Sequence, residues 1–420
     1  MNHVVVIGGG AAGLAAAIGA VRGPAQVTLL ERGHQLGRKV LASGGGRCNL
    51  SHERLAPERY HGAKPAFLRE VLSPFDAERF FSELGLLTAV EPDGRVFPRC
   101  GKAQAVLDVL KAELDRLSVT VLLGTQAVSL QRQDHGFLVK TAAVPWKKDG
   151  PAPHPQAGQD IRCDRVILAC GSPAYPQLGA GEAAYELAKA LGHRVHAPRP
   201  SLVPLLVKEN ALKRLHGLRV QAGLTVFCGG REAAKSQGEV LFTDYGISGP
   251  ATLDVSRAAV RGLAQGPVQG SLDLFPELSG AQLSAMLSAR WGSRPKRLLK
   301  DLFLGMFTAQ LSGAIMDSLG WDAHRPLDSL GHDGVQRLAE RLKDWRFEVT
   351  GNRPWSEAMV AAGGVDPDEV DPRTLESHKV PGLHLAGEML DVDGDSGGFN
   401  LHFAWASGMA AGRAAARRGS

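Results

Sequence analysis

The chain has 420 residues, of which 44% are hydrophobic and 22% charged, a composition typical of a globular protein. A chain of this length is too long for one simple core, so we expect two or three domains. Lysine and arginine exceed aspartate and glutamate by only five (48 against 43), and the basic residues are scattered, which argues against a nucleic-acid partner and for a bound anion. Five cysteines without a CxxC pair argue against disulfides and a zinc site, and no apolar run approaches the roughly 20 residues of a membrane helix, so we expect a cytoplasmic protein.

Residues 2–31 carry the pattern strand, glycine-rich turn, helix, strand. An apolar strand over 4–7 begins too close to Met1 to leave room for a signal peptide. The turn "GGGAAG" at 8–13 has the spacing Gly-x-Gly-x-x-Gly, an alanine-rich helix follows, and a second strand, "QVTLLE", ends at Glu31. This context predicts the phosphate-binding turn of a Rossmann unit rather than an ordinary glycine-rich turn.

Each glycine of the turn has an expected role. Gly8 makes the tight turn, Gly10 lets the backbone approach a pyrophosphate, and Gly13 lets helix and strand pack closely. Glu31 can accept hydrogen bonds from a ribose diol and would repel a 2′-phosphate. The pattern predicts a dinucleotide without distinguishing FAD from NAD. The cofactor contacts expected here are Gly8, Gly10, Ala11, Ala12, Gly13, Glu31 and Arg32.

A second glycine cluster follows in "LASGGGRCNL", residues 41–50. Glycines without side chains let a planar ring or a phosphate lie against the backbone. Nearby cations could neutralise a pyrophosphate or attract an anionic substrate, but a flexible surface loop would have the same spacing. The cofactor contacts expected here are Lys39, Ser43, Gly44, Gly45, Arg47 and Asn49.

At this point the sequence resembles the YhiN/BaiN-like (BaiN/RdsA) family of NAD(P)/FAD-dependent oxidoreductase flavoproteins, which includes an aminoacetone oxidase. The resemblance is carried in order by "GRKVLASGGGRCNLS", "GRVFPRCGKAQAVLDVL", "GEVLFTDYGISGPATLDVS" and the segment 361–412 that begins "AAGGVDPDEVDP". It implies bound FAD, with the loop Ser43–Asn49 beside the isoalloxazine. It also implies a discontinuous α/β Rossmann domain of the glutathione-reductase type, with an inserted β-barrel-like and helical substrate domain.

The middle of the chain fits that architecture. A strand at 119–124 and a hairpin around "QDHG" precede a Pro- and Gly-rich segment at 145–160, expected to be an exposed tip. "RVILACG" is another apolar strand, in which Cys170 is more typical of a small buried residue than of a nucleophile. The cofactor contacts expected in this part are Ala127, Ala169 and Gly171.

From about Ser201 short apolar strands alternate with turns, and from Ser279 the pattern becomes helical. We therefore expect an FAD-binding domain formed by 1–200 and 350–420. The insert would comprise a β-rich part, 201–275 with 320–349, and a helical subdomain, 276–319.

The C-terminal segment returns to the first domain. "GLHLAGE" predicts a strand, and "DSGGFNLHFAWASG" predicts a small-residue helix whose N-terminus could face the flavin and stabilise its reduced anionic form. The alternative for this segment is an ordinary packed helix. The cofactor contacts expected here are Gly387, Glu388, Gly398, Phe399, Asn400 and Leu401.

With one dinucleotide fingerprint, NAD(P)H would dock transiently at the flavin, or the organic substrate would donate electrons. We predict an FAD-dependent oxidoreductase that moves a hydride between a small-molecule substrate and flavin N5, with O2 or NAD(P)H as the other partner. Oxidase and reductase remain open, as does the oligomeric state. No catalytic residue is assigned, and the polar candidates are Arg47, Tyr245, Ser248 and His402, of which His402 is expected in the core.

Two alternatives stay open. An FAD-containing protein that binds or modifies RNA is compatible with the sequence pI of about 9.0, although no basic patch with interleaved aromatic residues supports it. A redox-inert scaffold stabilised by FAD would hold a flavin that no metabolite reduces.

Overall fold

The structure is a computed structural model that describes residues 1–144, 158–179, 181–292 and 297–417. Two compact units are formed, Met1–Arg199 with Met359–Ser420, and Pro200–Ala358. The sequence segment 145–157, most of the expected exposed tip, lies outside the described residues.

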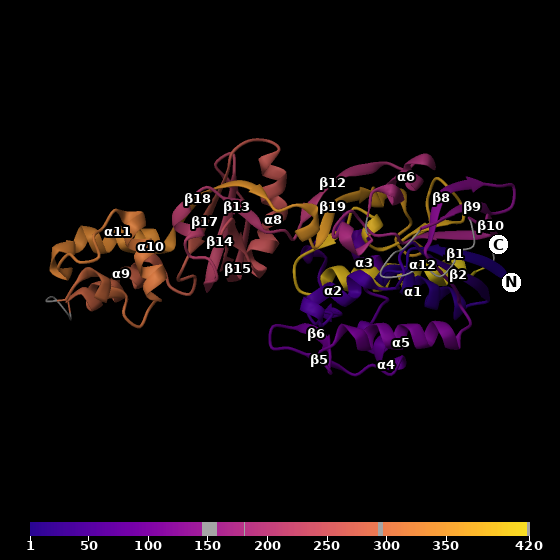
Figure 1. Ribbon diagram of the computed structural model, residues 1–420, viewed down its shortest axis with the longest axis horizontal. Coiled ribbons are helices and arrows are strands. Elements are labelled where there is room, and N and C mark those ends of the chain that lie inside the picture. Colours follow the sequence, from indigo (N-terminus) through magenta and orange to yellow (C-terminus); the bar gives the residue numbers. More distant parts are fainter. Residues whose placement is uncertain (145–157, 180, 293–296, 418–420) are drawn as a thin grey trace. The chain divides into compact units, whose positions relative to one another are not determined.

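The first unit is built on a parallel sheet of five strands in the order β20-β11-β1-β2-β7, of which β1 and β2 are labelled in Figure 1. Its central strand β1 pairs with β2 from Asn2↔Ala25 to Ile7↔Leu30, and with β11 from Val4↔Arg165 to Ile7↔Leu168. The residues Val4, Val5 and Val6 have no exposed surface, as expected of a strand covered on both faces. The carboxyl ends of β1, β2 and β11 therefore lie together at one edge.

The first unit contains further elements around this sheet. Its strands are β1 Asn2–Ile7, β2 Ala25–Glu31, β3 Ser51–His52, β4 Tyr60–His61, β5 Thr88–Val90, β6 Arg95–Pro98, β7 Thr120–Leu123, β8 Thr125–Arg132, β9 Phe137–Ala143, β10 Ile161–Cys163, β11 Arg165–Leu168, β12 Val195–Ser201 (which continues into the second unit), β19 Val360–Val365, β20 Leu383–Leu385 and β21 Asp393–Gly394. Its helices are α1 Ala11–Val21, α2 Arg38–Gly46, α3 Pro65–Leu72, α4 Ala77–Glu83, α5 Ala103–Arg116, α6 Ala183–Ala190 and α12 Phe399–Ala415.

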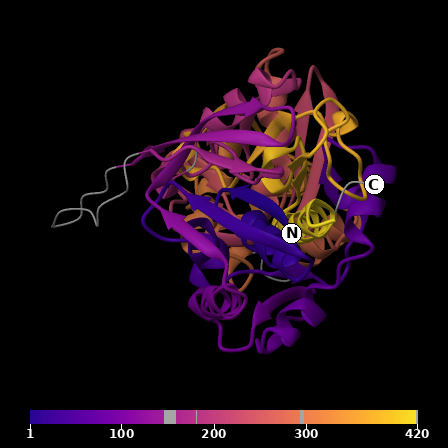
Figure 2. The same cartoon turned by 90° about the vertical axis from the view of Figure 1, so that its right-hand side faces the viewer.

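The two ends of the chain meet through α1 and α12, which pack against each other. Their contact depends on glycine, because a Cβ atom at Gly408 would lie 2.2 Å from the Ala12 carbonyl oxygen and one at Gly412 would lie 2.2 Å from that of Ala16. The side chain of Asn2 also donates a hydrogen bond to the Arg417 carbonyl oxygen, at 3.0 Å. Figure 2 shows the indigo N-terminal strand beside the yellow helix, so the first and last segments build one fold.

The second unit is a closed six-stranded barrel with helices inserted between its strands, of which α9, α10 and α11 lie between β17 and β18. The barrel order is β13-β16-β15-β14-β17-β18, with a core that includes Leu224, Phe242 and Trp345. The strands are β13 Leu205–Val207, β14 Arg219–Cys228, β15 Arg231–Phe242, β16 Gly246–Ser248, β17 Val268–Asp273 and β18 Trp345–Asn352. The helices are α7 Asn210–Lys213, α8 Pro250–Leu263, α9 Gly280–Gly292, α10 Ala309–Leu319 and α11 Gly331–Lys343.

The helical pattern of the insert follows its apolar spacing. In α11 the buried residues Val335, Leu338, Ala339 and Leu342 repeat every three or four positions and form one face. The predicted fold class, an α/β Rossmann domain with an inserted β-barrel and helices, is confirmed.

Candidate functional site

The glycine turn between β1 and α1 is required partly by packing. A Cβ atom at Gly13 would lie 1.7 Å from the Gly8 carbonyl oxygen, and one at Gly8 would lie 2.4 Å from the carbonyl oxygen of Ala169. Gly8 also has φ +109°, a conformation that favours glycine. These two glycines let α1 start directly against β1 and β11.

Gly10 has no such requirement. Its φ of −83° suits any residue, and no atom lies within 4 Å of the position a Cβ would take. Gly10 caps α1 without a side-chain hydrogen bond, and no acidic residue lies in the first turn. The uncapped, electropositive helix start therefore faces open space of the kind a pyrophosphate needs.

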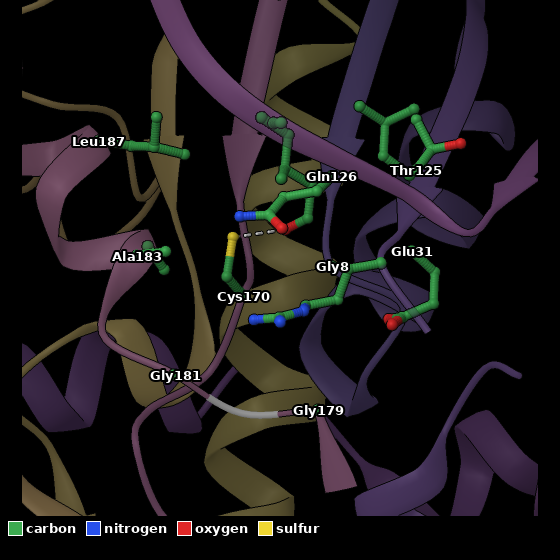
Figure 3. Close-up of a pocket in the computed structure, with 14 residues that line it drawn as sticks. Gly8, Glu31, Thr125, Gln126, Cys170, Gly179, Gly181, Ala183 and Leu187 are labelled. Carbon is green, nitrogen blue, oxygen red and sulfur yellow. Dashed lines mark hydrogen bonds between the residues drawn. The ribbon is translucent and has the colours of Figure 1, made fainter. Parts of the chain in front are cut away.

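A small pocket opens beside this turn, at the carboxyl ends of β1 and β2 (Figure 3). The carboxylate of Glu31 is fixed there by two backbone donors, since Gly9 N–H donates to its Oε2 at 2.8 Å and Gly33 N–H donates to its Oε1 at 2.6 Å. Of the predicted contacts, the structure places Gly8, Glu31, Arg32 and Ala127 in its lining. A Rossmann fold holds the adenosine half of a dinucleotide at this position.

Several lining residues were missed by sequence reasoning. They come from β8 and from the segment before and within α6, namely Thr125, Gln126, Gly179, Gly181, Ala183, Ala184 and Leu187. No motif marks them, and only the pairing of distant strands brings them to Glu31. Cys170 also lines the cavity, with its Sγ 3.2 Å from the Ile7 carbonyl oxygen. Cys170 is half-buried, and desolvation raises the pKa of its thiol to about 12, which favours the neutral thiol over the nucleophilic thiolate.

The second glycine cluster forms an irregular turn at the end of α2. Gly44, Gly45 and Gly46 all have positive φ, at +57°, +65° and +84°, and the buried Cys48 has φ +61°. No atom lies within 4 Å of a Cβ position at Gly45 or Gly46. The loop therefore presents a bare backbone surface, as a planar ligand requires.

This loop contacts the start of α12. A Cβ atom at Gly398 would lie 2.7 Å from Asn49 Oδ1, which is buried and has no hydrogen-bond partner among the described residues. Gly398 caps α12 without a side-chain hydrogen bond. An unsatisfied buried acceptor beside an uncapped helix start suits a ligand that carries both an N–H group and carbonyl oxygens, such as the isoalloxazine of FAD.

The other predicted residues of α12 have partners within the protein. The ring of Phe399 stacks on His52 with a centroid distance of 4.7 Å. The side chain of Asn400 accepts from Gly394 N–H at 2.8 Å and donates to the Gly394 carbonyl oxygen at the same distance. Asn400 thus shapes the loop before α12.

Two predicted residues from opposite ends of the chain form an ion pair. Lys39 Nζ lies 2.6 Å from Glu388 Oε2, and Glu388 Oε1 accepts from Ala361 N–H at 3.1 Å. Glu388 is largely buried and lies in a short turn that begins two residues beyond β20. These contacts fix α2, β19 and the end of β20 around one carboxylate.

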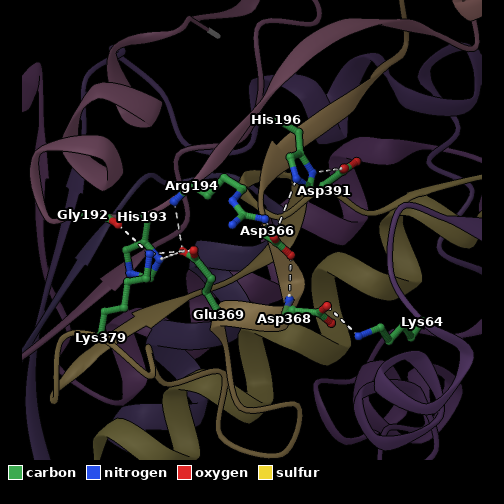
Figure 4. Close-up of polar contacts among 10 residues, drawn as sticks. All are labelled: Lys64, Gly192, His193, Arg194, His196, Asp366, Asp368, Glu369, Lys379 and Asp391. Atoms are coloured by element: carbon green, nitrogen blue, oxygen red, sulfur yellow. Dashed lines mark hydrogen bonds and ion pairs between the residues drawn. The ribbon is translucent and has the colours of Figure 1, made fainter.

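A neighbouring polar network fixes the strands β12 and β19 (Figure 4). His196 Nδ1 lies 2.7 Å from Asp391 Oδ2, whose other oxygen accepts from Gly363 N–H at 2.8 Å. The buried His193 bonds Glu369 at 2.9 Å, and burial lowers the pKa of the His193 imidazole. We assign this network a structural role, because its groups are satisfied by one another.

The polar candidates of the sequence belong to both units. Tyr245 and Ser248 belong to the second unit, where the Tyr245 ring stacks under Arg353 at 4.5 Å. His402 is 1% exposed and its Nδ1 bonds Ser51 Oγ at 2.9 Å, so it lies in the core as expected. Burial lowers the pKa of His402 to about 4. Within the described ranges, no cluster of His, Cys, Asp and Glu suits a metal ion, and no helix has the length and apolar composition needed to span a membrane.

The family model described as "HI0933-like protein Rossmann domain" matches residues 2–414. The chain belongs to this family. It is 36% identical to 3-dehydro-bile acid delta(4,6)-reductase of Clostridium scindens over 100% of both chains. It is 30% identical to ribosomal RNA dihydrouridine synthase of Escherichia coli, over 97% of this chain and 96% of that protein.

Among solved structures, the chain is similar to 3-ketosteroid-delta4-(5alpha)-dehydrogenase from Rhodococcus jostii, with a TM-score of 0.52 and 17% identity over 99% of this chain and 97% of that chain. This likeness concerns the fold. The family recognised from the sequence and the enzyme class, an FAD-dependent oxidoreductase, are confirmed.

Proposed function

We propose that this member of the HI0933-like family reduces a C=C bond that is conjugated to a carbonyl group, with electrons that a reduced nicotinamide passes to bound FAD. The observation that carries the proposal is the 36% identity, over the full length of both chains, to a relative named as a delta(4,6)-reductase of a 3-dehydro-bile acid. The dihydrouridine synthase relatives are named for a product in which a conjugated C=C bond has likewise been reduced.

When bound, FAD supplies a hydride acceptor and donor at N5. The chain's own part is to bind and orient the cofactor and to leave one ring face accessible. The open helix start at Gly10 suits the pyrophosphate, and the fixed carboxylate of Glu31 suits the ribose diol. The bare loop at 44–46 and the start of α12 suit the isoalloxazine.

We retain as proposed cofactor contacts all residues inferred from the sequence. They are Gly8, Gly10, Ala11, Ala12, Gly13, Glu31, Arg32, Lys39, Ser43, Gly44, Gly45, Arg47, Asn49, Ala127, Ala169, Gly171, Gly387, Glu388, Gly398, Phe399, Asn400 and Leu401. Because the sequence has a single dinucleotide fingerprint, we propose that NAD(P)H binds only transiently.

A second candidate substrate is a uridine of ribosomal RNA. The observation that favours it is the match to two ribosomal RNA dihydrouridine synthases over 97% of this chain. Uracil and a steroid enone share a C=C bond conjugated to a carbonyl, so one reducing site could serve either. A small conjugated ketone remains our first choice, since the relative that carries the proposal has the higher identity.

The test begins with the purified protein, whose cofactor is released by denaturation and identified by chromatography. NADH and NADPH are then added anaerobically, and bleaching of the visible flavin band is followed. A 3-oxo-Δ4 steroid acid and a ribosomal RNA transcript are offered in turn to the reduced protein. Restoration of the band with formation of the saturated product supports the proposal. Bleaching by aminoacetone, with no reaction of either conjugated substrate, would show an amine oxidase instead.

A further inference from the structure

The loop at 43–49 is held in an unfavourable conformation. Gly44, Gly45 and Gly46 are followed by Cys48 with φ +61°, a value that a residue with a side chain rarely adopts. Two backbone hydrogen bonds close the loop, from Arg47 N–H to the Gly44 carbonyl oxygen at 3.3 Å and from Cys48 N–H to that of Ser43 at 3.0 Å. Strain of this kind gathers at binding sites, where the surrounding structure maintains it.

The same loop holds the guanidinium group of Arg47 in a defined orientation. The guanidinium carbon of Arg47 lies 4.0 Å from the centre of the Phe97 ring, and its Nη2 lies 2.6 Å from Glu91 Oε1. Phe97 is 3% exposed, so the ring is a fixed platform. Stacking and one ion pair together determine the plane of the guanidinium and the edge that points at Glu91.

The other N–H donors of the Arg47 guanidinium are available to a ligand. An arginine side chain has five N–H donors. Within the described part of the chain, the Arg47 side chain interacts with Glu91 and with the ring of Phe97. Its side chain is 45% exposed. The neighbouring Arg95 differs, because its guanidinium contacts two carboxylates, Asp93 at 2.7 Å and Glu91 at 3.3 Å.

Arg47 also lies close to the proposed cofactor surface. A Cβ atom at Gly44 would lie 3.3 Å from the Phe97 ring and 3.0 Å from Asn49 N, and Asn49 in turn touches Gly398 at the start of α12. Arg47, the bare glycines and Asn49 thus belong to one short loop, and Asn49 Oδ1 lies beside the start of α12. A plain surface ion pair contributes little to stability and would not need such a loop.

We propose that Arg47 is a catalytic residue that donates hydrogen bonds to the carbonyl oxygen of the substrate and stabilises the oxyanion formed during reduction. This assignment rests on the proposed function. A hydride forms a new C–H bond at the carbon β to the carbonyl, and the C=C electron pair shifts to give an enolate with its charge on oxygen. Water then protonates the α-carbon, and the electrons come from FAD reduced by a nicotinamide.

Phe97 and Glu91 are positioning residues in this assignment. They hold the guanidinium before the substrate arrives, so that little reorganisation is needed when the negative charge develops. Both a steroid enone and a uracil ring would place such an oxygen on Arg47. Measuring turnover with a steroid enone and with RNA separately distinguishes the two substrates.

The first test measures binding of an oxyanion, separately from turnover. The full-length holoprotein is titrated with 4-nitrophenol, a planar phenol whose ionised form resembles an enolate and absorbs visible light. Wild type, R47K, R47Q and R95Q are compared, with flavin content measured for each. R95Q is the matched control, because it removes a guanidinium that contacts the same Phe97 and Glu91.

We expect wild type to bind the ionised probe and R47Q to bind it at least about tenfold more weakly, with R47K in between and R95Q within about twofold of wild type. Wild type that binds no phenolate, R47Q that binds like wild type, or R95Q that loses as much as R47Q would each overturn the assignment.

The second test measures both half-reactions with the steroid enone and with RNA. In R47Q we expect the rate of hydride transfer to substrate to fall about 100-fold while reduction of the flavin by NADPH is unchanged. A wild type that reduces neither substrate but binds phenolate through Arg47 would refute the proposed function alone. If wild type and R47Q reduce one of the two substrates at the same rate, the role of Arg47 is refuted while the proposed function stands.

Discussion

Lys39 Nζ and Glu388 Oε2 are 2.6 Å apart although 349 positions separate them in the chain. The pair joins a helix that follows the second strand to the end of the last strand of the same sheet. Both residues are partly buried, so removing one of them would leave the other charge without its partner in a partly buried site. The ion pair connects two segments of the chain, around Lys39 and around Glu388, that are both proposed to contact the cofactor.

Replacing Glu388 by Gln should weaken FAD binding about tenfold, a loss of about 1.4 kcal/mol. The amide keeps the size of the side chain but removes the charge that orients Lys39 and weakens the acceptor for Ala361 N–H. Flavin fluorescence during dilution of the holoprotein gives the dissociation constant. The control is Glu186→Gln, which removes an exposed ion pair with Lys189, and equal affinities in all three proteins would contradict the prediction.

Gly10→Val should abolish FAD retention and leave the fold intact. No protein atom lies within 4 Å of the position that the valine Cβ would take, and the φ of −83° is ordinary, so we expect the cost to fall on the ligand that shares the space. Thermal unfolding of the apoprotein and the visible flavin band are the two measurements. A fully yellow Gly10→Val protein would refute the assignment of this turn.

Gly13→Ala should behave in the opposite way. Its Cβ would lie 1.7 Å from the Gly8 carbonyl oxygen, so β1 and α1 must separate. We expect the apoprotein to lose about 2 kcal/mol or more of its free energy of unfolding, because the strain arises without any ligand. A Gly13→Ala apoprotein that unfolds at the wild-type denaturant concentration would contradict the close approach.

His402 should make the protein less stable in mild acid. Burial lowers its pKa from the ordinary value of 6.5 to about 4, with Asp76 acting weakly in the opposite direction. The unfolded chain therefore binds a proton as pH falls below 6.5 while the folded chain does not, and this contribution is lost between pH 6.5 and 4. Between pH 7.5 and 5 the expected loss is about 2 kcal/mol.

Urea unfolding of the apoprotein at pH 7.5 and pH 5 measures this loss in wild type and in His402→Gln. The variant should be less stable at pH 7.5, because it disturbs the bond to Ser51, but should lose less on acidification. His216→Gln changes an exposed histidine and should follow wild type. An unchanged acid loss in His402→Gln would assign the effect to other groups, of which His193 is the first to examine.

Cys170→Ser should retain hydride transfer within about twofold. A thiol whose pKa is raised to about 12 is not ionised at neutral pH, and its Sγ–H already faces the Ile7 carbonyl oxygen. Stopped-flow reduction of the flavin by NADPH is the appropriate measurement. A loss of a hundredfold or more with flavin content preserved would give this thiol a chemical role.

The first βαβ unit was predictable because its signals are local. The glycine spacing from Gly8 to Gly13 and the acid at the end of the second strand lie within one short stretch of sequence. The local backbone geometry of a strand, a turn and a helix places such near neighbours in space. The closeness of the two chain ends was expected from the family resemblance, which places the first and last segments in one FAD-binding domain. Family resemblance supplied the barrel insert, which periodicity alone described only as short strands.

The cavity lining and the orientation of Arg47 could not be predicted in that way. Gln126 from β8 and Leu187 from α6 line the same pocket as Glu31, although the three residues lie far apart in sequence. Arg47 is aimed by Phe97 and Glu91 from a separate hairpin, although the sequence shows only an arginine after three glycines. Local spacing determined which backbone turns could approach a phosphate, whereas long-range strand pairing decided which side chains surround it, because contacts between distant segments depend on how the whole chain packs.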